Sequence, residues 1–353
     1  MSHSHVPKSI LDLDMAALDA QMAMWGEPRF RSGQLWQWLY VKLATDWAEM
    51  TNLPKSLRER LAHMYLLDPL MPINEQHAQD GQTEKTLFRL ADSATVESVL
   101  MRYEGRNTVC VSTQVGCPIG CVFCATGQSG FVRNLSAGEI IAQPLYFARR
   151  IRQEGQSVNN IVVMGMGEPL LNYEATWQAI KTWNDRQGFN IGARRITLST
   201  AGYIPGITRL AQEPLQVGLA VSLHAPTDAL RSDLVPLNKT YPLAALLEAC
   251  RAYVSHTGRR ITFEYALIDG INDSAAQARH LAALLKGLLC HVNLIPLNPC
   301  PGIDLRPSRP ERVEAFQRAL EEKGIPVTVR LRRGIDIQAG CGQLRQQHQK
   351  TQP

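Results

Sequence analysis

Two hydrophobic patterns divide the chain at about residue 80. Before this point apolar residues recur at helical spacing, which predicts three short helices at residues 13–26, 32–44 and 54–65. After it, two β-rich runs, TLFRL and TVESVLMRY, are typical of paired strands. The sequence therefore predicts a small helical accessory domain over residues 1–80, followed by a linking β-hairpin over residues 81–106.

From about residue 108 onward, β-rich apolar runs alternate with helical stretches. The predicted strands have the sequences TVCVST, NNIVVMG, RITLST, VGLAVSL, ITFEYALI and HVNLIPL. Helices are predicted between them, for example at residues 137–151, 241–254 and 274–288. Six such units predict an α/β fold in which a parallel sheet forms a partial, TIM-like (βα)6 barrel over residues 107–325, with function at the carboxyl ends of the strands. Residues 326–353 are predicted to form a C-terminal strand and a tail.

Composition places the chain among ordinary globular proteins. Its 353 residues are 45% hydrophobic and 20% charged, enough for a large core. The sequence contains no run of eighteen apolar residues, and its start lacks the basic-then-apolar order of a signal peptide. We therefore expect a cytoplasmic protein without a membrane partner, in which eight cysteines serve metal binding or catalysis rather than disulfides. A net charge of +5 is only weakly indicative of a polyanionic partner.

Three closely spaced cysteines, Cys117, Cys121 and Cys124, lie in the loop after the first barrel strand. A structural zinc site normally takes four protein ligands, and CxxxCxxC without a later pair fits this poorly. A [4Fe–4S] cluster is normally held by four thiolates, so three would leave one iron open to another ligand. Zinc and iron–sulfur binding are thus both considered, and the spacing favours the cluster.

Short polar or glycine-rich motifs follow the later strands. The motif MGMGEP follows the second strand, where glycine lets the backbone approach a ligand and a carboxylate can accept hydrogen bonds. Taken alone, this motif is more typical of a plain tight turn, and an isolated histidine is more often structural. Together the strand ends predict a ligand site formed by Gly167, Glu168, Ser199, Ser222, Leu223, His224 and Asn298.

The CxxxCxxC loop, with Phe123 before its last cysteine, resembles that of the radical-SAM enzymes. The resemblance implies that Cys117, Cys121 and Cys124 hold a [4Fe–4S] cluster. Its open iron would be chelated by the amino and carboxylate groups of S-adenosylmethionine (SAM). Reductive cleavage of SAM would then give methionine and a 5′-deoxyadenosyl radical. The strand-end residues would bind SAM.

A larger set of motifs resembles the RlmN/Cfr family of RNA adenosine methyltransferases, and within it the RlmN type. The motifs are VESV, CVSTQVGCPIGCVFCATGQSGFVRNL, GMGEP, SLHAP, FEYALIDGIND, NLIPLNP and DIQAGCGQL, and the resemblance covers about residues 20–345. It departs at Gly340, where alanine is expected more often. The resemblance implies methylation of carbon 2 of an adenosine in 23S rRNA, at the peptidyl transferase centre. It implies the same reaction at the adenosine 3′ to the anticodon in tRNA.

The same resemblance assigns catalytic roles to three residues. Cys341 would be methylated by a first SAM, and a second SAM would generate the radical that activates this S-methylcysteine toward adenine. Cys110 would resolve the adduct through a transient disulfide with Cys341, and Glu97 would accept the ring proton. Without the resemblance, Cys110 would be interpreted as a buried small hydrophobe, as are Cys250, Cys290 and Cys300, and Glu97 as an exposed strand residue. The resemblance further implies an electron donor such as flavodoxin or ferredoxin, and a monomer.

Other interpretations stay open at this stage. Cfr-type methylation of adenine carbon 8 uses the same cysteines, and a radical-SAM enzyme could take a different substrate. A non-enzymatic, zinc-bound RNA-binding module is the third alternative. For RNA contacts, the basic residues just before the reactive tail, Arg330, Arg332 and Arg333, are better candidates than the N-terminal domain, whose first 80 residues carry a net charge of −3.

Overall fold

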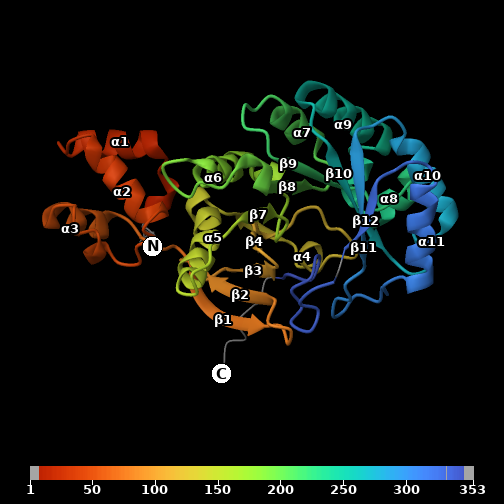
Figure 1. Ribbon diagram of the computed structural model, residues 1–353, viewed down its shortest axis with the longest axis horizontal. Helices are drawn as coiled ribbons and strands as arrows, with labels where there is room; N and C mark the ends of the chain where they lie inside the picture. The colour runs from red at the N-terminus through yellow and green to blue at the C-terminus, as the bar shows by residue number, and fades with distance from the viewer. Residues whose placement is uncertain (1–7, 331, 346–353) are drawn as a thin grey trace, which may run out of the picture.

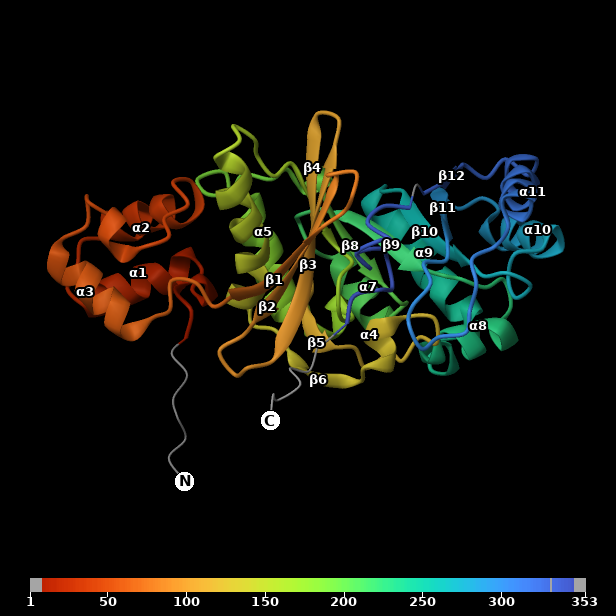
Figure 2. The same ribbon diagram turned by 90° about the horizontal axis from the view of Figure 1, so that it is seen from below.

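A lobe of helices lies beside a curved ten-stranded sheet in this computed structural model, which describes residues 8–330 and 332–345 (Figure 1). Residues 1–7 of the predicted segment 1–80 lie outside the described residues. So do residues 331 and 346–353 of the predicted segment 326–353. Figure 2 shows the lobe next to α5 (Ala137–Arg152), at the opposite end of the molecule from α10 (Ala275–Leu285) and α11 (Pro310–Glu321). No helix in the described ranges combines the length and the apolar character needed to cross a membrane.

The N-terminal lobe contains the three predicted helices, α1 (Met15–Met24), α2 (Phe30–Tyr40) and α3 (Lys55–Met64). Asp14 caps α1 by accepting a hydrogen bond from the Ala17 amide, which supplies a partner for one of the free N–H groups of the first turn. The lobe is joined to the barrel by polar contacts as well as by a continuous hydrophobic core. Arg149 of α5, for example, pairs with Asp68 at 2.6 Å.

Parallel strands form most of the sheet, and all six predicted strands are present. They are β4 (Arg106–Cys110), β7 (Asn160–Val163), β8 (Ile196–Thr200), β9 (Gly218–Ser222), β10 (Ile261–Leu267) and β11 (Cys290–Pro296), followed by β12 (Val327–Val329). Each is hydrogen-bonded to the next in chain order, so the sheet winds in one direction as expected for a partial barrel. The parallel pairing of β12 with β11 confirms the predicted C-terminal strand.

An antiparallel extension continues the sheet beyond β4. Strands β2 (Thr83–Arg89) and β3 (Thr95–Tyr103) form the predicted hairpin, but β3 also pairs with β4, so the hairpin belongs to the main sheet. Strand β1 (Met71–His77) pairs with β2, whereas the sequence analysis assigned these residues to the helical domain. That assignment was wrong because β1 is a mostly exposed edge strand, whose polar residues give no period-two hydrophobic signal.

Helices cover the outer face of the barrel. They are α5 (Ala137–Arg152), α6 (Tyr173–Asn184), α7 (Ile204–Ala211), α8 (Asp228–Leu234), α9 (Leu243–Thr257), α10 (Ala275–Leu285) and α11 (Pro310–Glu321). Capping boxes at Ser136 and Ser274 fix the starts of α5 and α10, which confirms two of the helices expected from the sequence. The candidate site lies at the carboxyl ends of the parallel strands.

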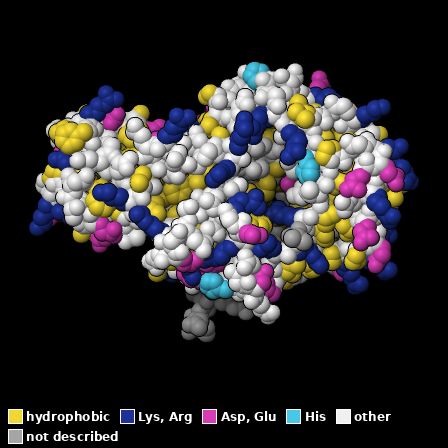
Figure 3. All heavy atoms as spheres, in the orientation of Figure 1, with side chains coloured by type: hydrophobic (Ala, Val, Ile, Leu, Met, Phe, Trp, Pro, Cys, Tyr) yellow, Lys and Arg dark blue, Asp and Glu magenta, His cyan; other side chains and the backbone are white. Residues whose placement is uncertain are grey.

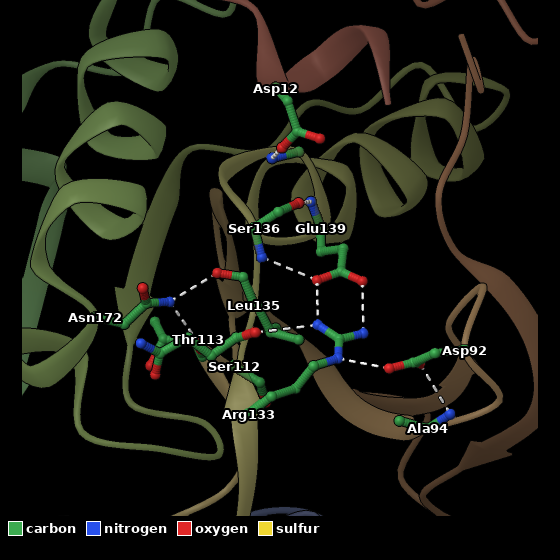
Figure 4. Close-up of polar contacts among 12 residues, drawn as sticks. Asp12, Asp92, Ala94, Ser112, Thr113, Arg133, Leu135, Ser136, Glu139 and Asn172 are labelled. Atoms are coloured by element: carbon green, nitrogen blue, oxygen red, sulfur yellow. Dashed lines mark hydrogen bonds and ion pairs between the residues drawn. The ribbon is translucent and has the colours of Figure 1, made fainter. Parts of the chain in front are cut away.

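The cysteine loop is carried by a small separate hairpin of β5 (Gln114–Gly116) and β6 (Phe131–Asn134), with α4 (Ala125–Gln128) between them. Arg133 anchors this hairpin: its guanidinium pairs with both oxygens of Glu139 and with Asp92 (Figure 4). Asn172 donates to the carbonyls on either side of the hairpin, those of Thr113 and Leu135. The loop is therefore held at both of its ends.

Candidate active site

One cavity of about 200 Å³ lies at the carboxyl ends of the parallel strands, and it collects most of the predicted site residues. The predicted residues that line it are Cys110, Cys117, Cys121, Cys124, Gly167, Glu168, Ser199, Ser222, His224, Asn298 and Cys341. They come from the cysteine loop, from the ends of five different strands and from the C-terminal tail. Sequence positions more than 200 residues apart therefore meet in one place, as expected for a barrel of this kind.

The cysteine loop folds back tightly on its own hairpin. Gly116 has φ +77°, and a Cβ there would lie 1.9 Å from the Gly130 carbonyl oxygen, so only glycine fits. Burial raises the pKa of Cys117 to about 12, and also raises those of Cys121 and Cys124. For Cys121 the neighbouring Cys124 and Cys117 add to this effect. Three partly buried thiols with raised pKa values favour a cationic group among them, since it would stabilise the thiolates.

The arrangement fits a cluster better than a single ion. Within residues 8–330 and 332–345, no three His, Cys, Asp or Glu side chains are placed to hold one metal ion. A [4Fe–4S] cluster makes a different demand, since each thiolate binds a different iron and the sulfurs stand apart. Three thiols facing one cavity without a fourth cysteine ligand in the loop match a cluster with one iron open to a second ligand.

Glu168 lies at the start of the loop after β7 and is buried. Its carboxylate accepts hydrogen bonds from the amides of Ala201, at 2.7 Å, and Leu170, at 3.1 Å. Burial raises the pKa of Glu168 to about 7, although these amides oppose the shift. The preceding Gly167 has φ +105° and packs on Gln114, so a side chain at this position would collide with Gln114. The acid is thus rigidly held and available to a cationic ligand.

His224 follows β9 in a left-handed conformation, with φ +60°. Its Nδ1 accepts a hydrogen bond from the Ala266 amide at 3.0 Å, which leaves Nε2 as the protonated nitrogen of a neutral ring. Burial lowers the pKa of His224 to about 3, and Arg231 adds to the shift. The ring also packs edge-on against Phe123 of the cysteine loop. His224 is therefore held in place by the Ala266 amide and also lines the cavity.

Arg231 of α8, which is fully buried, organises the strand ends beneath the cavity. It donates to the carbonyls of Leu223, Ser222 and Ala201 and to the Asn238 side chain. Burial lowers the pKa of Arg231 to about 10, still well above neutral pH, so it remains a cation. These bonds fix the loops after β8 and β9 on which Ser199, Ser222 and His224 depend.

We expect Arg231→Met to lower the free energy of unfolding by about 3 kcal/mol, because several buried carbonyls lose their donor. The midpoint of urea unfolding, followed by circular dichroism, measures this change. Arg209→Met is the matched control, since Arg209 pairs with Glu174 on the exposed surface and should contribute less than about 1 kcal/mol. Equal midpoints for the two variants would contradict the role given to Arg231.

The C-terminal tail brings Cys341 to the cavity through backbone contacts. Asn298 donates to the Cys341 carbonyl at 3.1 Å, and the Ala125 amide donates to the Gly342 carbonyl at 2.7 Å. A Cβ at Gly340 would lie 2.6 Å from the Asn298 amide nitrogen, so glycine permits this close approach. The thiol of Cys300, interpreted from the sequence as a buried hydrophobe, also contacts the Gly342 carbonyl, at 3.3 Å.

Cys110 ends β4 on the wall of the same cavity. Burial raises its pKa to about 12, the neighbouring Cys341 adds to the effect, and Arg330 opposes it. Arg330 also lines the cavity, beside Glu264. The two thiols that were predicted to react with one another thus share a cavity with the Arg330 guanidinium.

Comparisons with known proteins agree with this geometry. Residues 8–67 match the ribosomal RNA large subunit methyltransferase N-terminal domain, and residues 111–282 match the radical SAM superfamily. A probable dual-specificity RNA methyltransferase RlmN from Chloroflexus aurantiacus is 49% identical, with 99% of this chain and 95% of that protein covered. The dual-specificity RNA methyltransferase RlmN 1 of Myxococcus xanthus is also 49% identical, with 97% of this chain and 95% of that protein covered.

The chain belongs to the RlmN family. A crystal structure of a radical SAM methyltransferase from Sphaerobacter thermophilus superposes on it with a TM-score of 0.94 and 56% identity, over 96% of this chain and 99% of that one. The resemblance and the fold class inferred from the sequence are therefore confirmed, and the chain is a SAM-dependent radical methyltransferase. Family membership also implies SAM and a [4Fe–4S] cluster as cofactors, which the three cavity-facing thiols fit. The zinc-bound, non-enzymatic module is thereby excluded.

Two predicted site residues of this RlmN-family chain do not line the cavity. Leu223 is fully buried, and its side chain packs in the core. Glu97 is also fully buried, and its carboxylate lies 3.1 Å from Lys85 Nζ and accepts a hydrogen bond from the Arg345 amide. An exposed Glu97, the alternative interpretation, was wrong. The carboxylate is therefore in contact with the C-terminal tail.

Some cavity residues were not found from the sequence. Glu264 of β10 lines the cavity, is bonded to Asn293, and has a pKa raised mainly by burial. A charged residue within the apolar run ITFEYALI was the available signal. The three arginines proposed as phosphate contacts all line the cavity, and Arg333 also packs on Tyr103. Figure 3 shows Lys and Arg side chains gathered around the middle of the face it draws.

Proposed function

We propose that this chain methylates carbon 2 of a specific adenosine in 23S rRNA, at the peptidyl transferase centre, and of the adenosine 3′ to the anticodon in tRNA. The relatives named dual-specificity RNA methyltransferases support two RNA substrates. The observation that carries the proposal is the meeting of Cys341, Cys110 and the three loop cysteines at one cavity. Carbon 2 is electrophilic and offers no nucleophile to an ordinary methyl donor, so a radical route is needed.

Cys117, Cys121 and Cys124 would hold the cluster, and Glu168, Ser199, Ser222, His224 and Asn298 would bind SAM beside it. When bound, the cluster and SAM supply the one-electron chemistry that activates the carrier methyl group. Leu223 would contribute only backbone, because its side chain is in the core. The mostly apolar wall, which includes Ile119, Ile295 and Leu297, would help to keep water from the reacting groups.

Cys341 would carry the methyl group as S-methylcysteine and deliver it to adenine, so that each turnover consumes two SAM molecules. Cys110 would then attack the sulfur of Cys341, releasing the RNA and forming a transient disulfide. Arg330 lies beside both thiols, and its positive charge opposes the rise that burial causes in the pKa of Cys110. Glu97 would accept the proton that leaves the ring.

The partners follow from this chemistry. The disulfide and the cluster both need electrons, and we propose a small donor protein such as flavodoxin or ferredoxin. The basic residues around the cavity, Arg330, Arg332 and Arg333, would contact phosphates next to the target base. We further propose that the enzyme acts as a monomer in the cytoplasm.

Anaerobic incubation with SAM, a reductant and each RNA, followed by nucleoside mass spectrometry, tests the proposal. We expect 2-methyladenosine from both RNAs. Formation of 8-methyladenosine would favour the Cfr-type reaction instead. Methylation of only one of the two RNAs would show that the other is not a substrate. Deoxyadenosine without any methylated RNA would indicate a radical-SAM enzyme with another substrate.

We expect Glu168→Gln to weaken SAM binding by about tenfold, because the ligand's amino group loses an anionic hydrogen-bond acceptor. The pKa of about 7 adds a pH dependence. Lowering the pH from about 8 to about 6 protonates the carboxyl group and should weaken SAM binding in the original enzyme. Equilibrium binding of SAM to the cluster-loaded protein measures both effects. The Gln variant should lose the pH dependence, and a variant that keeps it would contradict this role.

A further inference from the structure

Lys85 and Glu97 form a buried ion pair where β2 and β3 meet the reactive tail. Lys85 Nζ lies 3.1 Å from Glu97 Oε1, and the two residues are only 5% and 0% exposed. Two charges removed from water are tolerated when their remaining hydrogen-bonding groups also find partners. Here partners on both sides of the pair come from the tail.

The tail binds the pair at two points that bracket Cys341. The Gln338 carbonyl accepts a hydrogen bond from Lys85 Nζ at 3.3 Å, and the Arg345 amide donates to Glu97 Oε2 at 2.9 Å. Gln338 has φ +53°, a conformation that costs energy for a residue with a side chain, so its placement depends on contacts such as this one. Both bonds use tail backbone, and so they require Lys85 and Glu97 but no particular tail side chain.

The strand register places this pair next to Cys110. Lys85 lies opposite Val99, and Val99 lies opposite Cys110 on the following strand. Glu97 is two residues before Val99, so Lys85, Glu97 and Cys110 share one face of the sheet. The neighbouring Glu84 points to the other face and pairs there with Arg150 at 2.7 Å. The face that carries the resolving thiol is therefore also the face that docks the tail.

We propose that Lys85 is a positioning residue that, together with Glu97, latches the reactive tail beside Cys110. While the tail is docked, Glu97 Oε2 holds the Arg345 amide. When the tail moves, the Arg345 amide leaves this oxygen, and Lys85 keeps the carboxylate oriented. The latch thus couples the position of Cys341 to the hydrogen bonding of the proposed base. This inference rests on the proposed function of Glu97 and Cys341.

Limited trypsin digestion of the cluster-loaded protein without RNA tests the docking. We expect Lys85→Met to accelerate cleavage after Arg333 by about tenfold, because the tail opens more often. Lys85→Arg should restore most of the protection, since it keeps a cation that can donate to both partners. Arg150→Met, which removes a partly buried pair from the opposite face, should leave tail cleavage unchanged. If Lys85→Met folds poorly, Lys85→Gln gives the same comparison. An unaltered cleavage rate in the folded Lys85 variant overturns the latch.

Single-turnover methylation tests the coupling. We expect Lys85→Met to accumulate a protein–RNA adduct, as Glu97→Gln should, and to form methylated RNA at least about tenfold more slowly, with recovery in Lys85→Arg. Normal product formation by Lys85→Met would overturn its positioning role. Normal product formation by Glu97→Gln would instead contradict the proposed role of Glu97 as the base. Trypsin digestion would then still test whether Lys85 docks the tail.

Discussion

Alanine in place of Cys117, Cys121 or Cys124 is expected to abolish deoxyadenosine formation and to leave the purified protein with little iron or acid-labile sulfide. Each substitution removes one of the three thiolates that would bind the cluster, and the described residues offer no fourth cysteine in the loop to replace it. The measurements are iron and sulfide content after anaerobic purification, the visible absorption spectrum, and deoxyadenosine produced from SAM under reducing conditions.

Cys250→Ala is the matched control for these variants. Cys250 is also buried, but it lies in α9 and outside the cavity, so its loss should change neither iron content nor SAM cleavage. A normal cluster spectrum together with deoxyadenosine formation in any loop variant would contradict the assignment of that cysteine. Loss of iron in Cys250→Ala as well would indicate that destabilisation of the barrel, rather than loss of a ligand, explains the result.

The barrel was predictable because its strands and helices have strong local patterns. A parallel strand buried on both faces is a continuous apolar run, as in NNIVVMG, and Ser136 and Ser274 mark helix starts with capping boxes. Strand β1 lacks such a pattern because it is an exposed edge. The order of strands in a parallel sheet also follows from chain order, so residues at successive strand ends could be expected to converge.

Contacts of the tail could not be predicted in the same way. The bonds of Lys85 with Gln338 and of Glu97 with Arg345 join residues about 250 positions apart, and no local pattern encodes such a pairing. The positive φ of His224 is equally invisible in the sequence, because it is imposed by the packing around β9 and β10. The residue types at the site could thus be predicted from the sequence, whereas the burial and hydrogen bonding of Glu97 could not.

Cys341→Ala and Cys110→Ala are expected to stop the reaction at different points, although both remove a thiol from the same cavity. Without Cys341 no sulfur carries the methyl group, so neither S-methylcysteine nor an RNA adduct should form. Without Cys110 the methyl group should load, adenine should be attacked, and the thioether adduct should persist because no second thiolate can resolve it.

Mass spectrometry of the tail peptide and denaturing electrophoresis with labelled RNA separate these outcomes. We expect a methylated peptide and a protein–RNA crosslink with Cys110→Ala only. A crosslink with Cys341→Ala alone would reverse the two roles, and identical behaviour of the variants would contradict both. Cys290→Ala, at a buried thiol outside the cavity, should behave like the original enzyme.

Resolution also predicts a movement of the tail. For a disulfide, the Cα atoms of Cys110 and Cys341 must approach to roughly 4.4–6.8 Å, whereas methyl loading requires Cys341 to face SAM. The glycines on either side of Cys341, Gly340 and Gly342, flank the segment that has to move. Each turnover should therefore consume two electrons to reduce the disulfide. If the cluster of the methyl-loaded enzyme is first reduced and the excess reductant is then removed, a single turnover should leave one released RNA and one Cys110–Cys341 disulfide per enzyme, detectable by peptide mapping without reduction. Release of RNA with both thiols free would exclude this route.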